Sequence, residues 1–150
     1  MERIKVVVRY VNGKMLKGST IDLFPNKDRF HVVPMDKPND QPIEVIINQL
    51  KAVFVVRDFR GVPHYAERKG HPEGERPYGL LLEVTFMDGE VLVGSCTSFD
   101  LKRQGFFLFP GDPKSNNLRV FVVCSALKRI RQLLTTAGDY IEIPIPGRKK

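Results

Sequence analysis

Two polar segments of the chain carry basic side chains of the kind that bind anions. One segment holds Lys27 and Arg29, and the other holds Asp100, Lys102 and Arg103. Lysine and arginine neutralise phosphate charges, so two such loops facing one ligand would suit RNA phosphate or a nucleotide. The alternative interpretation is a pair of solvated loops whose charges keep the protein soluble.

A second group of polar residues follows two apolar segments. The first cluster is Arg57-Asp58-Phe59-Arg60, in which the aspartate could hold an arginine in place for an anion. The second cluster contains Lys114, Asn116 and Asn117 in a turn-rich loop that could contact a ligand or partner. The alternatives are an ordinary local ion pair in the first and a wide turn with Asx hydrogen bonds in the second.

The residue types needed for catalysis or metal binding are not grouped in the sequence. The three histidines, His31, His64 and His71, are scattered, and Cys96 and Cys124 lie in separate apolar segments. Four closely spaced Cys or His ligands would indicate structural zinc, and a nucleophile with a base would indicate an enzyme. We therefore predict buried free thiols, no metal, no cofactor and no enzymatic activity.

Composition and charge set wide limits. The chain has 150 residues, 42% hydrophobic and 27% charged, with a net charge of +7 that permits nucleic acid or acidic partners. No run approaches the roughly 18 apolar residues of a membrane span. The first residues enter a strand-like run without the apolar core of a signal peptide, so we expect a cytoplasmic protein.

An internal repeat organises the sequence. Residues 12–36 align without a gap to residues 88–112 at an offset of 76, and seven of the 25 aligned pairs are identical. The identities include Gly18/Gly94 and Pro34/Pro110, which constrain the backbone. After one inserted residue, the alignment resumes with Leu50 over Leu127. Self-similarity of this kind predicts two copies of one structural unit.

Each copy reads as five short strands rich in Val, Ile, Phe and Tyr. The predicted strands are 5–10, 15–21, 29–34, 43–47 and 52–57 in copy 1, and 81–86, 91–99, 105–109, 118–123 and 129–134 in copy 2. Asn12-Gly13 and Asp88-Gly89 predict type I′ hairpins between the first two strands. Gly18 and Gly94 inside the second strands predict a sharply bent sheet that closes into a barrel. A helix over 126–134 is the weaker alternative, because the matching segment of copy 1 is strand-like.

The organisation that follows is a first barrel over 1–57, a linker over 58–78 and a second barrel over 79–134. The linker is rich in Gly and Pro, and about twenty residues without structure are uncommon within one domain. Residues 135–150 are predicted to add an edge strand around Tyr140–Pro146 and a basic tail, Arg148-Lys149-Lys150. The fold class is all-β, with two tandem five-stranded, strongly bent small barrels.

This arrangement resembles the Sm-like (LSm-type) small barrel, and copy 2 resembles it more closely. Its Asp88-Gly89 turn, Gly94 six residues after the aspartate and later Phe99-Asp100 are similar to the first motif of that family. The resemblance covers some fifty residues of each copy. It implies barrels that pair strand four of one unit with strand five of the next, either within the chain or in a ring of three chains.

The same resemblance implies single-stranded RNA binding, through an Asp, a stacking residue and an Asn in one loop and a basic-Gly pair in another. Asp100 fits this pattern, but Gln104 or Gly105 stands at the Asn position, and Asp22 with Asn26 gives a partial match at shifted spacing. The basic-Gly pair is replaced by Asn48-Gln49 in copy 1 and by Cys124-Ser125 in copy 2. The standard RNA pocket is therefore expected to be absent.

A second resemblance covers nearly the whole chain. Residues 52–59 and 105–117 are similar to a family of uncharacterised bacterial domains, some of which sit beside signalling modules. Together these observations predict a non-enzymatic bacterial binding or adaptor module with a protein partner in signalling. The alternatives are a single-stranded RNA-binding protein and a structural module that forms homo-oligomers.

Overall fold

The computed structural model describes residues 3–37, 39, 41–59, 79–97, 99–111, 115–135 and 137–146. It is built from strands, so the predicted all-β class is confirmed. The helical elements in these residues are two single 3₁₀ turns, η1 (Ile47–Gln49) and η2 (Cys124–Ala126). None of the helices described is long and apolar enough to cross a membrane.

Eleven strands form the structure, and each predicted strand matches one of them to within three residues. The first half contains β1 (Ile4–Tyr10), β2 (Met15–Thr20), β3 (Arg29–Pro34), β4 (Ile43–Ile46) and β5 (Leu50–Val56). The second half contains β6 (Leu80–Phe86), β7 (Val91–Cys96), β8 (Gly105–Pro110), β9 (Asn117–Val123) and β10 (Leu127–Leu133). The last strand is β11 (Tyr140–Ile143), which is the predicted edge strand.

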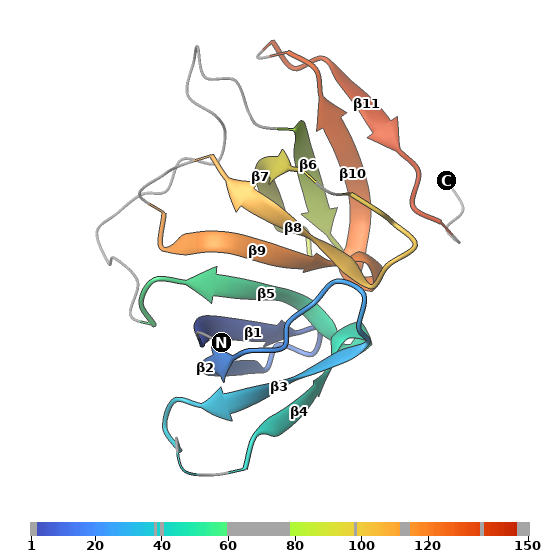
Figure 1. Cartoon of the computed structure of the whole chain (residues 1–150). Helices are drawn as coiled ribbons and strands as arrows, with labels where there is room; N and C mark the ends of the chain where they lie inside the picture. The colour runs from blue at the N-terminus through green and yellow to red at the C-terminus, as the bar shows by residue number, and fades with distance from the viewer. Residues whose placement is uncertain are drawn as a thin grey trace.

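All eleven strands belong to one antiparallel sheet in the order β11-β10-β6-β7-β8-β9-β5-β1-β2-β3-β4. The two halves of this sheet lie one above the other in Figure 1. Among the described residues, the end strands β4 and β11 each pair with a single neighbour, β3 and β10. The sheet is therefore open, whereas we had expected two closed barrels. The halves are also joined by strand pairing, because β5 pairs with β9.

The pairings of the first half recur in the second. Val6 pairs with Gly18 and Gly18 with Pro34, and at an offset of 76 Leu82 pairs with Gly94 and Gly94 with Pro110. The fourth and fifth strands repeat at an offset of 77, because one residue is inserted before them. Sequence self-similarity and strand register therefore agree along the whole of both halves.

The hairpin turns differ from the predicted type I′. A type I′ turn needs positive φ at both central residues. Gly13 and Gly89 have φ of +92° and +93°, but Asn12 and Asp88 do not, because positive φ occurs only at glycines among the described residues. Tyr10 N donates to Lys14 O at 2.9 Å and Gly13 N to Tyr10 O at 3.1 Å. This is a three-residue loop made of a type I turn and a glycine bulge, which suits the same Asn-Gly and Asp-Gly signals.

The two strand glycines stand where a neighbouring backbone comes close, as predicted. A Cβ on Gly18 would lie 2.3 Å from Val33 O, and a Cβ on Gly94 would lie 2.6 Å from Phe109 O. Any side chain would force the second and third strands of the half apart at the point where the sheet bends.

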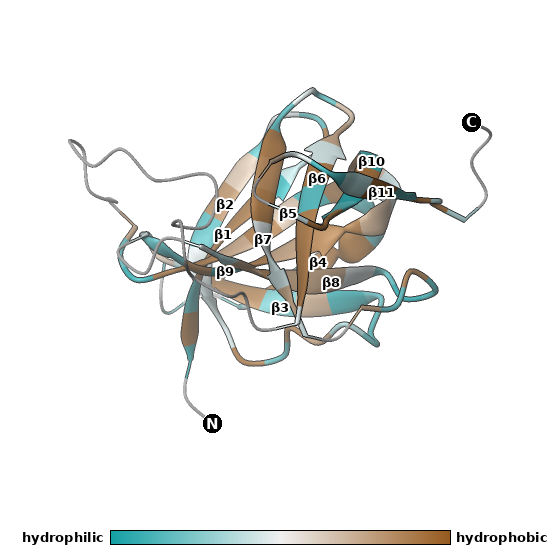
Figure 2. Ribbon diagram, turned by 90° about the horizontal axis from the view of Figure 1, so that it is seen from above, coloured by the Kyte–Doolittle hydropathy of each residue, from teal (hydrophilic) through white to brown (hydrophobic). Residues whose placement is uncertain are grey.

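Two apolar cores form, and the central strands β5 and β9 contribute to both. From β5, Phe54 packs in the core of the second half, while Val53 packs in the core of the first. From β9, Val122 packs in the core of the second half, while Phe121 packs in the core of the first. Because each of these strands is buried on both faces, brown apolar segments lie in the middle of Figure 2. The two cores therefore share the strands β5 and β9.

Candidate ligand-binding groove

A groove of about 660 Å³ lies where the first half meets the second. Side chains from both halves line it: Val7, Arg9, Met15, Lys17, Lys51, Phe54, Val56, Phe59, Asp88, Glu90, Leu92, Asn116 and Asn117. The lining combines apolar side chains with three cations, two carboxylates and two amides. This mixture is typical of a binding site that holds an apolar group and fixes an anionic one.

The pleat of β1 and β2 places the cations of the groove. Val6 and Val8 are buried in the first core, so the alternate residues Lys5, Val7 and Arg9 lie on the opposite face of β1. On β2, Lys17 pairs with Val7 and therefore lies on the same face. Residues from two neighbouring strands thus present positive charge toward the second half.

An aromatic ring lies beneath one of these cations. Phe54 on β5 pairs with Val7 and is 8% exposed. The Arg9 guanidinium carbon lies 5.7 Å from the Phe54 ring centroid, within the range of a cation–π contact. Arg9 and Phe54 both line the groove, so a charged and an aromatic group lie side by side there.

Lys51 holds the two halves together at one end of the groove. Its ammonium lies 2.7 Å from Asp88 Oδ2, contacts Glu90 Oε1, and sits 4.9 Å from the Phe86 ring centroid. Burial disfavours the ammonium, but hydrogen bonds and charge attraction from Asp88 and Glu90 outweigh it and raise the pKa of Lys51. The hydrogen bond from Lys51, followed by the one from the Glu90 N–H, lowers the pKa of Asp88.

The predicted cluster around Arg57 and Asn116 is brought together at the other end of the groove. Asp58 N donates to Asn116 Oδ1 at 3.1 Å, and Asn116 Nδ2 donates back to Asp58 O at 2.9 Å. Arg57 N donates to Asn116 O, and Arg57 Nε donates to Ser115 O at 3.2 Å. Loops 58 residues apart are thus joined by one backbone–backbone and three side-chain–backbone hydrogen bonds. Arg60 and Lys114 lie outside the described residues.

One further contact connects the loop after β5 to a cation of the groove. Lys17 Nζ lies 3.4 Å from Phe59 O, and the Phe59 side chain packs against the second core. Asn117 beside it lines the groove, and its backbone N–H is held by Ser115 Oγ at 3.0 Å. Three cations, two carboxylates and two amides therefore surround one space, beside apolar side chains such as Phe54 and Val7.

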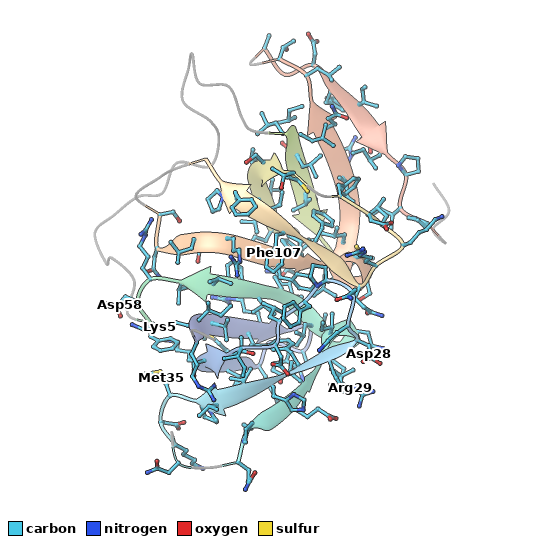
Figure 3. The ribbon with its side chains drawn as sticks, in the orientation of Figure 1. Lys5, Asp28, Arg29, Met35, Asp58 and Phe107 are labelled. Carbon is cyan, nitrogen blue, oxygen red and sulfur yellow. The ribbon has the colours of Figure 1, made fainter. Side chains whose placement is uncertain are left out.

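The predicted basic loops lie elsewhere. Figure 3 shows Asp28 and Arg29 at the opposite end of the molecule from Lys5 and Asp58. The two loops do adjoin, because Pro25 of the first and Asp100 and Arg103 of the second line one small hollow of about 140 Å³. Phe107 lies in the same hollow.

The two arginines of these loops already contact carboxylates. Arg29 Nε lies 3.1 Å from Asp28 and its Nη1 lies 3.4 Å from Glu44, while Arg103 Nε lies 3.8 Å from Asp100. Asp100 also accepts from Lys102 N, and the Lys27 ammonium sits 5.1 Å from the Phe24 ring centroid. An anion would have to compete with carboxylates already in contact, so these loops are weaker anion sites than their composition indicates.

Asp22 and His31 form a local pair that anchors the loop before β3. Asp22 accepts from His31 N at 2.9 Å, lies 2.8 Å from His31 Nδ1 and accepts from the Thr20 hydroxyl at 2.9 Å. Burial opposes its ionisation, but these hydrogen bonds dominate and lower the pKa of Asp22. The hydroxyl donates to the carboxylate and not to the imidazole, so the arrangement is not that of a nucleophile and its base.

The two cysteines lie in different elements, Cys96 at the end of β7 and Cys124 in η2. Cys96 is buried, as predicted, whereas Cys124 is only half-buried. Within the ranges that the structure describes, no three Cys, His, Asp or Glu side chains are placed to hold a metal ion.

A comparison with protein-family models supplies the relationship. The model described as a family of unknown function, DUF6982, matches residues 2–134. The chain belongs to the DUF6982 family. The matched segment of this DUF6982 chain contains β1 to β10 and stops before β11. A search of curated proteins and a search of solved structures gave no match.

The resemblance to an uncharacterised domain family is therefore confirmed for this DUF6982 protein. Sequence reasoning missed the groove cations Arg9, Lys17 and Lys51. Their signal was present, because Arg9 alternates with buried valines on β1. The uninterrupted apolar run Ala52–Val56 also indicated a strand covered on both faces.

Proposed function

We propose that the protein is a non-enzymatic binding module made of two Sm-like repeats docked through strand pairing. Each half has the same five strands in the same order and register. The seam joins the fifth strand of one half, β5, to the fourth strand of the other, β9. This is the pairing that the Sm-like resemblance implies between neighbouring units, and it supports the two-repeat interpretation.

The groove between the repeats is the proposed ligand site. The observation that carries this proposal is that Arg9, Lys17 and Asn116, from both repeats, face one space of about 660 Å³. Strand pairing across the seam and the Lys51 contacts fix the walls, so the site exists before a ligand binds.

The proposed ligand is anionic and carries an apolar or flat group. Asp88 and Glu90 already neutralise Lys51, so its charge serves the contact between the halves. Arg9 and Lys17 remain to meet the anionic part, while Phe54 and Val7 line the groove beside them to meet the apolar part. An acidic segment of a signalling protein and a single-stranded RNA both have this character.

Fluorescence anisotropy tests the site with two labelled probes, a single-stranded RNA of mixed sequence and a glutamate-rich peptide containing phenylalanine. We expect one probe to bind, more weakly as salt rises, and the Arg9→Ala/Lys17→Ala variant to lose about tenfold or more in affinity. Lys27→Ala/Lys102→Ala is the matched control, because it removes the same number of charges at the opposite end of the molecule. Failure of both probes at low salt contradicts the proposal.

Single-stranded RNA binding at the loop end is the second candidate, and one observation favours it. The loops that precede β3 and β8 meet beside Phe106 and Phe107, as shown by the hollow that Pro25 and Asp100 share. In the same titration this candidate predicts the reverse outcome. RNA affinity would fall in Lys27→Ala/Lys102→Ala and remain in the groove variant.

A further inference from the structure

The C-terminal strand β11 occupies on β10 the place that β9 occupies on β5. Val53 of β5 pairs with Phe121 of β9, and its counterpart at an offset of 77, Ile130 of β10, pairs with Ile143 of β11. Both pairings are antiparallel. One strand edge of each half is therefore covered in the same way, once by the other repeat and once by a separate segment of the chain.

The covering strands also fill the same position with an apolar side chain. Phe121 of the second repeat is fully buried in the core of the first half, together with Val123 of the same strand. Ile143 packs against the core of the second half, as does Ile145 after it. The covering strand thus supplies core packing as well as backbone hydrogen bonds.

The opposite end of the sheet, β4, lacks the side chains that make β9 a docking strand. On the outward face of β8 and β9, Phe107 and Phe121 pack edge to face with centroids 5.1 Å apart. In the first half His31 and Glu44 stand at these positions, paired across β3 and β4. Glu44 contacts Arg29 and lies 3.9 Å from His31, and placing it in an apolar core would bury a charge.

We infer that β11 closes an edge of β10 that would otherwise accept a strand of the β9 type, and that the polar pair His31 and Glu44 keeps the β4 edge of a second copy from serving as that strand. Both ends of the sheet are thus closed, and strand pairing stops at two repeats. A β4 edge with an apolar pair at positions 31 and 44 should be able to dock on β10, because the β5–β9 seam is the same contact made within one molecule. This inference concerns assembly, and it stands apart from the ligand proposed for the groove.

The test measures molar mass by light scattering across a concentration series. The wild type is expected to be a monomer. Ile143→Asp should release β11, and Ile141→Asp is the matched control, because Ile141 is on the same strand but 51% exposed. His31→Phe/Glu44→Phe restores the apolar pair but should remain monomeric while β11 is in place. Adding Ile143→Asp to that variant should at least double the mass as concentration rises.

Hydrogen exchange of the full chain distinguishes release of β11 from unfolding of the protein. The β10 amides should exchange faster in Ile143→Asp than in Ile141→Asp, while the β5 amides stay protected, which shows that the rest of the fold is intact. A synthetic peptide of residues 137–146 should return the triple variant toward monomer. A triple variant that is folded, exposes β10 and stays monomeric overturns the inference. So does a wild type that assembles through β4 and β10.

Discussion

Phe121 of β9 lies opposite Val53 of β5 across the seam, and both are completely buried in the core of the first half. Phe121 therefore belongs to one repeat by sequence and to the other by packing. The seam is a shared core, so neither half can lose the other without exposing large apolar side chains. This dependence leads to the first prediction.

Phe121→Ala should lower the free energy of unfolding by about 3–5 kcal/mol, because it leaves a cavity between the repeats. Phe109→Ala is the control, since Phe109 is 39% exposed and should cost far less. Urea unfolding followed by far-UV circular dichroism measures both. We expect a single transition, because the two cores share strands. Two separate transitions, with Phe121→Ala affecting neither, would contradict the shared core.

Gly94→Ala should destabilise the protein by about 1–3 kcal/mol, because the new Cβ would lie 2.6 Å from Phe109 O and must push β7 and β8 apart. Gly89→Ala in the hairpin loop provides the comparison. There the Cβ would meet nothing within 4 Å, and the cost is the positive φ of +93°, about 1–2 kcal/mol. Thermal unfolding of both variants measures the two losses of stability. A Gly94→Ala variant as stable as the wild type would refute the close approach.

The sequence was sufficient to predict the strands, both strand glycines and the added edge strand, because each depends on local pattern. The turn type was wrong because Asn12-Gly13 suits a two-residue and a three-residue loop equally, and the choice depends on the register of the paired strands. The seam between β5 and β9 depends on packing between segments far apart in the chain. The apolar run of β5 showed that both faces are covered, but not by which strand.

In the groove, too, the local sequence pattern predicts one part and packing between distant segments decides the rest. Alternation along β1 places Lys5 and Arg9 on one face, but it does not identify the surface opposite them. That surface comes from the second half, whose hairpin carries Asp88 and Glu90 toward Lys51. Composition alone favoured Arg29 and Arg103 as anion-binding residues. The sequence does not show that Asp28 and Asp100 pair with these arginines in the folded protein.

Lys51→Met should remove a pH-dependent part of the stability. The pKa of Asp88 is lowered, so its contribution is complete above the ordinary aspartate value and is lost as pH falls through the lowered value. The pKa of Lys51 is raised, so its contribution is complete below the ordinary lysine value and is lost as pH rises through the raised one. The stability difference between wild type and Lys51→Met should be constant from about pH 5 to about pH 9 and should shrink outside that range.

The partners of Lys51 are about half exposed, so the difference on this plateau should be modest, about 1 kcal/mol. Urea unfolding at a series of pH values measures it. Lys128→Met serves as the control, because it removes the same charge from an exposed position of β10. A Lys51→Met difference that does not change between neutral and acidic pH would show that Asp88 does not stabilise the seam.

Asn116→Ala should open one end of the groove. Its side chain accepts from Asp58 N and donates to Asp58 O, so the substitution removes two hydrogen bonds between loops, worth about 1–2 kcal/mol together. Asn117→Ala is a close control, because Asn117 also lines the groove but is held through its backbone N–H. Hydrogen exchange at the Asp58 amide should accelerate in the first variant and not in the second. If the Asp58 amide stays protected in Asn116→Ala, the two Asn116–Asp58 hydrogen bonds do not hold this end of the groove. The contact between Lys17 and Phe59 must then fix it instead.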